Sequence, residues 1–388
     1  MCNNGHMSKA KILFDAEPLV GNKKTGVGYY TEHLIKGLLN HGAYNYVLHG
    51  YFFNFLNRKP KPLANSRTIG FSEVLFPGKV LTLCRRFGFQ PFLEFFTPKQ
   101  SDIVLFTNYV SLPLLRKRKT ALVVYDLGFM DHPEFTQERN LQFLQKFCPP
   151  SIQQADLIIT ISEFTKERLL HYFPNLKAKI IVTPIPPSQE SVTPQRLGKR
   201  LEGAGIEKGH YILYLGTIEP RKNLQALAQA YRLLPQSLRG AYSLVLAGGK
   251  GWKDEGILSA IADLQAKGAN IIMPGYISDE EKAALYSNAA CFVLPSHYEG
   301  FGMPVLEAMQ YGTPVALSDI PVFHEVAGGA AAYFDKDNPE DISAVLAELL
   351  TNKALRERLR ARGAKQLKTF SWQTNAELVI HAFGEVLK

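Results

Sequence analysis

Cysteine, tryptophan and long apolar runs are all scarce in this sequence. Only four cysteines and two tryptophans occur in 388 residues. The cysteines lack the spacing of metal ligands, and so few scattered thiols favour a reducing compartment over a disulfide framework. No apolar run reaches the about 18 residues that a membrane-spanning helix needs, and the polar N-terminus does not read as a secretory signal. We therefore expect a globular protein of the cytoplasm.

The positive charge of the chain is concentrated in its first half. The formal net charge is +9. Residues 1–189 carry 23 Lys and Arg against 13 Asp and Glu, whereas residues 190–388 carry 21 against 22. The basic clusters are Arg58–Lys61, Arg85–Arg86 and Arg116–Lys119. They are typical either of a solvated surface or of a face that meets an anionic membrane. No nucleic-acid recognition motif accompanies them, so we expect no nucleic-acid partner.

Strand and helix patterns alternate along most of the chain. Short apolar runs predict strands at 11–15, 103–106, 120–125, 157–161, 211–215, 243–246, 271–273, 291–294 and 314–317. Helical spacing of apolar residues predicts helices at 27–39, 224–234, 256–267, 279–287, 304–311 and 341–350. Residues 52–100 are rich in Phe, Pro and basic residues, and we interpret them as a functional insertion. Strands separated by helices indicate βαβ units and parallel sheets, hence an α/β protein.

A proline-rich stretch divides the pattern into two halves. Three prolines fall within Pro184–Pro187, which is typical of a stiff linker, and the strand–helix alternation restarts after it. We expect an N-terminal domain over 7–187 and a C-terminal domain over 188–370. Ligands of open α/β sheets bind beyond the carboxyl ends of the strands, so a cleft between the two domains is the expected site.

The most informative segment is Ser296–Met309, which carries two carboxylates eight positions apart, Glu299 and Glu307. Two glycines and a proline lie between them, which predicts a loop that turns into a helix with Pro304 at its first position. The free amides and the dipole of such a helix start favour an anion, and Glu307 is expected in the first turn. An ordinary strand–loop–helix connection is the alternative interpretation of this segment.

Three further loops carry candidate ligand-binding residues. Gly216-Thr217 and Arg221-Lys222 lie between a strand and a helix, which is typical of a phosphate-binding arrangement. Gly26 and Gly28, after the first strand, resemble half of a dinucleotide fingerprint and would let backbone amides approach a diphosphate. Tyr276 and Ile277 follow another strand, where backbone groups could read a nucleobase edge.

With these motifs in view, the chain resembles the family 4 retaining glycosyltransferases of the GT-B fold, bacterial mannosyltransferases in particular. The resemblance covers nearly the whole length. Its motifs are the paired glutamates with the intervening Gly-Phe-Gly-Met-Pro, the Gly216–Asn223 element, the glycine loop Thr25–Tyr30, the segment 155–165, and Phe370-Ser371-Trp372. It implies two Rossmann-like domains whose parallel sheets face each other across a cleft. The final helix, 371–388, would return to the N-terminal domain.

The resemblance also implies roles for the site residues. Glu307 would bind the ribose of a nucleoside-diphosphate sugar, and Glu299 would face the transferred sugar. Arg221 and Lys222 would neutralise the leaving diphosphate. The amides around Phe301, Gly302 and Met303, with Pro304 and Val305 beside them, would hold sugar hydroxyls and phosphate. Two positions depart from the family pattern: Tyr125-Asp126 replaces the common His-Asp, and Thr217 replaces an arginine.

The expected reaction moves a hexose from a nucleotide sugar, GDP-mannose for example, to a glycan or lipid-linked acceptor in polysaccharide synthesis. We identify no Asp-x-Asp pair of the manganese-binding kind, so we expect transfer without metal or cofactor, and with Asp126 positioning a hydroxyl. Front-face attack needs no protein nucleophile, and Glu299 is the candidate if a double displacement operates. A lipid-linked acceptor would place the protein at the inner face of the membrane. The alternatives are a synthase with a small acceptor and a non-catalytic binding protein of the same fold.

Overall fold

The computed structural model divides the chain into two compact units. The structure describes residues 9–20, 25–42, 46–53, 69–74, 84, 89–97, 100–187 and 196–388. The first unit comprises Met1–Leu127, Glu138–Ile185 and Ser371–Lys388, and the second comprises Gly128–Gln137 and Pro186–Phe370. The basic clusters Arg58–Lys61 and Arg85–Arg86 fall outside the described residues.

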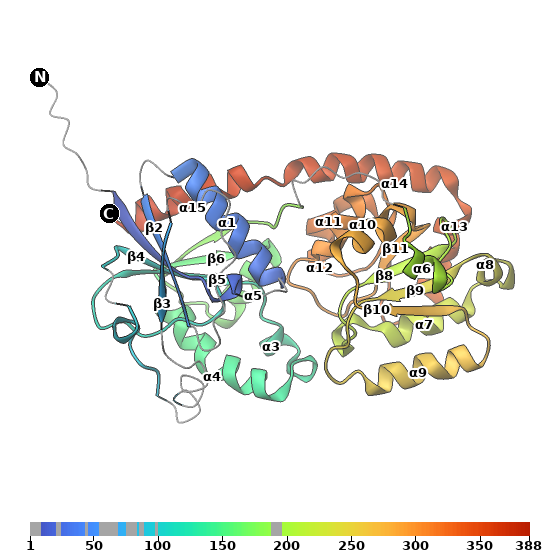
Figure 1. Cartoon of the computed structure of the whole chain (residues 1–388), viewed down its shortest axis with the longest axis horizontal. Coiled ribbons are helices and arrows are strands. Elements are labelled where there is room, and N and C mark those ends of the chain that lie inside the picture. Colours follow the sequence, from blue (N-terminus) through green and yellow to red (C-terminus); the bar gives the residue numbers. More distant parts are fainter. Residues whose placement is uncertain are drawn as a thin grey trace, which may run out of the picture. The chain divides into compact units, whose positions relative to one another are not determined.

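The first unit is built on a seven-stranded parallel sheet in the order β3-β2-β1-β4-β5-β6-β7. Its strands are β1 (Ala10–Asp15), β2 (Tyr46–Phe53), β3 (Gly70–Val74), β4 (Ile103–Phe106), β5 (Lys119–Val124), β6 (Leu157–Thr160) and β7 (Lys179–Val182). Its helices are α1 (Gly26–Gly42), α4 (Glu138–Gln154), α5 (Glu163–Tyr172) and α15 (Trp372–Val386). Strands β4 and β6 are buried along their whole length, as continuous apolar runs covered by helices on both faces require (Figure 1).

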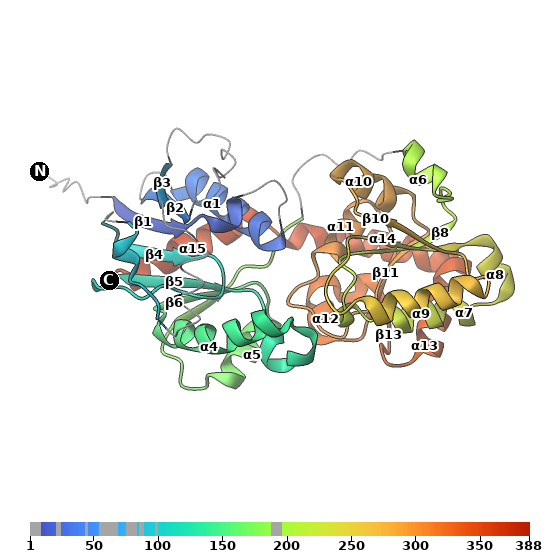
Figure 2. The same cartoon turned by 60° about the horizontal axis from the view of Figure 1, so that its bottom comes forward.

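The second unit repeats this architecture with six parallel strands in the order β10-β9-β8-β11-β12-β13. Its strands are β8 (Tyr211–Leu215), β9 (Ser243–Ala247), β10 (Ile271–Gly275), β11 (Cys291–Leu294), β12 (Val315–Ser318) and β13 (Ala331–Phe334). Its helices are α3 (Gly128–Asp131), α6 (Lys199–Gly203), α7 (Leu224–Leu233), α8 (Gln236–Ala241), α9 (Glu255–Ala266), α10 (Asp279–Asn288), α11 (Met303–Gln310), α12 (Pro321–Ala327), α13 (Pro339–Thr351) and α14 (Lys353–Gln366). Helices α7 and α9 cover one face of the sheet, and α11 and α14 the other (Figures 1 and 2).

The C-terminal helix α15 packs within the first unit, which confirms the predicted return of the chain. Its N-cap Ser371 accepts a hydrogen bond from the amide of Thr374. Helix α15 lies beside α1, where a Cβ added to Gly37 would come within 2.9 Å of Ala376 (Figure 1). The Trp372 ring stacks on His33 with centroids 4.9 Å apart. Two parallel α/β units with this returning helix are the predicted fold.

The interpretation of residues 52–100 as an insertion outside the core is wrong in part. Strand β2 extends to Phe53, and β3 (Gly70–Val74) adds an edge strand to the sheet, paired in register from His49–Gly70 to Phe53–Val74. An edge strand is covered less than a central one, so its sequence, Gly-Phe-Ser-Glu-Val, has no continuous apolar run. The short apolar run by which the other strands are predicted is therefore absent from β3.

Candidate functional site

The candidate site forms where the order of strands in the second sheet reverses. Strands β8 and β11 are adjacent, while the chain runs from β8 to β9 and β10 on one side and from β11 to β12 and β13 on the other. Loops after two such strands meet at the carboxyl edge of the sheet, where α/β proteins bind ligands. The amide of His297 donates to the carbonyl of Arg221 at 2.9 Å. The two loops singled out from the sequence are therefore neighbours.

The Glu299 carboxylate is enclosed by three donors. Arg221 Nη1 donates to Oε2 at 2.7 Å, and Lys222 Nζ donates to Oε1 at 2.5 Å. The Ser296 hydroxyl donates to Oε1 at 2.7 Å. Arg221 Nη2 also donates to Glu219 Oε1 at 2.7 Å. Lys222 and Glu299 are both buried, at 8% and 7% exposure, whereas the Arg221 side chain is 25% exposed. Glu219 and Ser296 stand in the quoted motifs, but the sequence analysis assigned them no role.

Electrostatics keeps this carboxylate ionised. Burial by itself raises its pKa, but the attraction of Arg221 and Lys222 outweighs burial and lowers the pKa of Glu299 from 4.5 to about 2. A carboxylate with three donors has little freedom to attack a sugar carbon. Its geometry instead fixes the positions of the two cations.

This lowered pKa predicts a loss of stability in acid. The folded-state pKa lies below the unfolded one, so the stabilisation is complete above about pH 4.5 and is lost as the pH falls towards 2. We expect the difference in unfolding free energy between the native protein and Glu299→Gln to shrink by about 1–2 kcal/mol from pH 5 to pH 3. Urea unfolding at each pH measures it, with the exposed Glu202→Gln as the control. A difference that stays constant over this range would contradict the assignment.

Glu307 lies in a separate polar cluster on α10 and α11. Lys282 Nζ donates to Oε1 at 2.8 Å, and the Tyr286 hydroxyl donates to Oε2 at 3.0 Å. The attraction of Glu307 overcomes the effect of burial and raises the pKa of Lys282. Each carboxylate oxygen retains further acceptor capacity for a ligand hydroxyl. The sequence analysis missed Lys282 and Tyr286, because helical spacing shows that they share a face of α10 but not what that face meets.

The start of α11 differs from the prediction in two details. The helix begins at Met303, so Pro304 is its second residue, and Glu307 is its fifth and lies beyond the first turn. Gly302 is the N-cap with φ 101°, a conformation that favours glycine, and a Cβ there would lie 2.8 Å from the Phe323 ring. No side chain of the described residues caps the helix. Pro304 has no amide hydrogen, and the amide of Val305 donates to the Gly302 carbonyl at 3.0 Å, so in this first turn the amide of Met303 remains available to an anion.

The other predicted donor-binding residues of this unit surround the same edge of the sheet. Phe301 and Val305 are buried, whereas Thr217 is exposed and its carbonyl accepts from the Tyr214 hydroxyl. Gly216 directly follows β8. It lies so close to Gly248 that a Cβ on Gly248 would be 1.9 Å from the Gly216 oxygen. Tyr276 is 62% exposed, and its carbonyl accepts from Arg200, while Ile277 is half-buried.

One Asp-x-Asp spacing exists, Asp335–Asp337, and the sequence analysis overlooked it. It follows β13, and its carboxylates are engaged locally. Asp335 Oδ1 accepts from the amide of Asp337 at 2.9 Å, and Asp337 pairs with Lys336 and with His297. Among the described residues, no three His, Cys, Asp or Glu side chains are grouped as a metal site would require.

The first unit contains the remaining predicted residues. Gly26 and Gly28 form the first turn of α1, where the amide of Gly28 donates to Thr25 Oγ1 at 3.3 Å. Asp126 follows the carboxyl end of β5 and is hydrogen-bonded to Tyr109, and burial together with this carboxylate raises the pKa of Tyr109 well above its usual range. Tyr125 is buried, and its hydroxyl donates to the carbonyl of Thr107 at 2.8 Å. Tyr125 is therefore part of the core of the first unit.

The segment that follows Asp126 packs with the second unit. The domain boundary drawn from the sequence places Gly128–Gln137 in the first domain, but its contacts are with the second unit. The Trp252 indole donates to the carbonyl of Phe135 at 2.7 Å. The Phe135 ring stacks on His297 at 5.4 Å, and the His132 ring contacts Tyr298 at the same distance. The carbonyl of Tyr298 accepts from Arg221. This segment thus supports the loop that contains Glu299.

Known proteins are similar to this chain over most of its length. Residues 201–366 match the family model described as glycosyl transferases group 1. The O-antigen chain mannosyltransferase B of Escherichia coli is 31% identical, over 96% of this chain and 99% of that protein. The O-antigen chain mannosyltransferase RfbU of Salmonella typhimurium is 30% identical, over 61% of this chain and 60% of that protein.

A solved structure supports the fold. The sucrose-phosphate synthase of Thermosynechococcus elongatus superposes with a TM-score of 0.71 at 16% identity, over 97% of this chain and 99% of that one. At that identity the similarity shows the architecture alone.

Among the described residues, no helix is both long and apolar enough to cross a bilayer.

Proposed function

The chain belongs to the group 1 glycosyl transferases, and on that premise we propose that it is a retaining hexosyltransferase. It moves mannose from a nucleoside-diphosphate donor, GDP-mannose, to a glycan or lipid-linked acceptor in the synthesis of a cell-surface polysaccharide. The names of the two relatives support both the sugar and the pathway class.

The observation that carries the proposal is the cluster of Arg221, Lys222 and Glu299 at the carboxyl edge of β8 and β11. Two cations held in fixed positions near an uncapped helix start suit a group whose negative charge increases during the reaction. A leaving nucleoside diphosphate is such a group. Glu307 then takes the ribose hydroxyls, and the amides around Gly302 take sugar hydroxyls and phosphate.

Retention follows from attack on the face that the diphosphate leaves. The bond from the anomeric carbon to the phosphate oxygen breaks while the acceptor oxygen bonds to the same carbon. The acceptor proton moves to the departing phosphate oxygen, so no protein base or nucleophile is required. The three donors on Glu299 support this route over a covalent intermediate on that residue. Asp126 positions a hydroxyl of the acceptor or the sugar.

Arg221, Lys222 and the start of α11 provide the counter-charge that a divalent cation supplies in other transferases. We therefore propose transfer without a metal or cofactor. The basic first unit would contact an anionic membrane peripherally, which suits a lipid-linked acceptor.

A thermal-shift screen of GDP, UDP and their sugar conjugates tests the donor. A ligand at one hundred times its dissociation constant adds about 2.7 kcal/mol of stability, which corresponds to several degrees in a unit of this size. We expect GDP and GDP-mannose to raise the melting temperature, with the same shift in excess EDTA. A shift with UDP conjugates alone would overturn the mannose donor, and a shift abolished by EDTA would overturn metal-free binding.

A further inference from the structure

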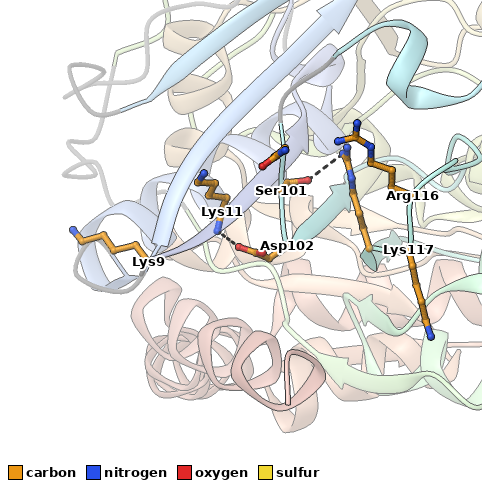
Figure 3. Close-up of a pocket in the computed structure, with 8 residues that line it drawn as sticks. Lys9, Lys11, Ser101, Asp102, Arg116 and Lys117 are labelled. Carbon is orange, nitrogen blue, oxygen red and sulfur yellow. Dashed lines mark hydrogen bonds between the residues drawn. The ribbon is translucent and has the colours of Figure 1, made fainter. Parts of the chain in front are cut away.

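Five basic side chains gather at the edge of the first sheet where its strands begin. Asp126 follows a strand at the opposite edge, where the strands end. Strands β1, β4 and β5 are parallel neighbours, so their amino ends meet. The residues around those ends line an open hollow of about 330 Å³ (Figure 3). It is lined by Lys9, Lys11, Gln100, Ser101, Asp102, Arg116, Lys117 and Arg118.

Three of the five basic side chains of this hollow lack a partner among the described residues. Its single carboxylate, Asp102, accepts the backbone amide of Lys11 at 2.7 Å (Figure 3). The side chains of Lys11, Arg116 and Lys117 have no hydrogen-bond or ion-pair partner among the described residues. Like charges held this close repel one another, and an anion between them would relieve that repulsion.

Arg118 distinguishes the hollow from a merely solvated basic surface. Its side chain is only 5% exposed, and Nη1 donates to the Ser101 hydroxyl at 3.3 Å. Nη2 lies 3.6 Å from Glu94 Oε1, too far for a hydrogen bond, and has no hydrogen-bond partner among the described residues. Glu94 itself accepts the amides of Leu115 and Arg116. The charge of Arg118 is thus paired with Glu94 and its guanidinium is held in place beside Ser101, while the Nη2 donor keeps an unfilled hydrogen bond.

We propose that this hollow is a second anion site, which binds a phosphate-bearing ligand with at least two negative charges. The planar donors of Arg116 and Arg118 and the point charges of the lysines suit phosphate oxygens. The hollow lies at the amino end of β5, and Asp126 follows the carboxyl end of the same strand, whose length is about 20 Å. The hollow is therefore distinct from the candidate catalytic residues. The phosphate belongs either to a lipid headgroup or to a soluble compound.

A triple variant, Lys11→Gln/Arg116→Gln/Lys117→Gln, tests the proposal. Its matched control, Lys199→Gln/Lys208→Gln/Lys267→Gln, removes three exposed charges from the second unit. The probes are vesicles of phosphatidylglycerol, with phosphatidylcholine as the neutral reference, and inorganic pyrophosphate measured by calorimetry. All calorimetry uses a Lys222→Ala background, which weakens any binding at the candidate donor site.

We expect the triple variant to bind at least one probe about tenfold more weakly, while the control binds as before. Loss of vesicle binding alone assigns a lipid headgroup, and loss of pyrophosphate binding assigns a soluble phosphate compound. Equal binding of both probes by the triple variant and the control overturns the proposal. So does equal binding to charged and neutral vesicles with no pyrophosphate heat.

The Arg118→Lys variant distinguishes binding through defined hydrogen bonds from general attraction to positive charge. It keeps the charge of Arg118 and removes the planar donors of the guanidinium. We expect it to weaken the affected probe severalfold, with its melting temperature recorded to verify folding. Native affinity in a folded Arg118→Lys protein would overturn the role of Arg118. Donor binding in the screen above is measured separately, so failure of either proposal is distinguishable from failure of the other.

Discussion

Replacing Lys222 with alanine should lower the turnover number of sugar transfer at least ~100-fold, the scale of losing one transition-state contact. Two effects act together. The leaving diphosphate loses a buried counter-charge, and Glu299 keeps its negative charge with Arg221 as its one remaining cationic partner. The uncompensated carboxylate then repels the same diphosphate. The turnover number with saturating donor measures the effect.

A double variant shows which effect dominates. If the unbalanced carboxylate accounts for much of the loss, Lys222→Ala/Glu299→Gln recovers part of the rate that Lys222→Ala loses, because the two residues are coupled. The control is Lys208→Ala, an exposed lysine of the same unit, which should react at the native rate. Circular dichroism of each variant verifies that it is folded. A folded Lys222→Ala protein with a native turnover number would reject the role of Lys222.

The sequence predicted those parts of the site that lie within short loops. Two loops illustrate this, Gly216–Asn223 and Ser296–Met309: each follows a strand, contains glycine and leads into a helix. Such a pattern depends on neighbouring residues alone, so it can be recognised in the sequence. The adjacency of β8 and β11 follows from the reversal of strand order that parallel α/β sheets share. Arg221, Lys222 and Glu299 are therefore all predictable from the sequence.

Residues that reach the site from elsewhere in the chain could not be predicted in the same way. Lys282 and Tyr286 belong to α10, and only the packing of α10 against α11 brings them to Glu307. The hydrogen bond from Trp252 to Phe135 joins residues 117 positions apart. No local pattern encodes such a contact. The Asp-x-Asp spacing of Asp335 and Asp337, by contrast, is visible in the sequence, and the sequence analysis overlooked it.

The second large effect is expected at Glu307, where Glu307→Ala should lower kcat/KM at least ~100-fold. The variant removes the acceptor for the ribose hydroxyls and leaves Lys282 without its partner at 2.8 Å. A positive charge then remains where the hydroxyls would bind. Glu202→Ala, at an exposed position of α6 in the same unit, is the matched control.

A donor analogue ties this loss to the ribose itself. The native protein should bind the ribose form of the donor nucleotide at least about tenfold more tightly than its 2′-deoxy form, because the deoxy form leaves a carboxylate oxygen without its hydroxyl. Glu307→Ala should bind both forms with equal affinity. Equal affinities in the variant with unequal ones in the native protein assign the hydroxyl to Glu307. If the variant still prefers the ribose form tenfold, another residue holds the ribose, and Glu307 acts by positioning Lys282 and Tyr286 instead.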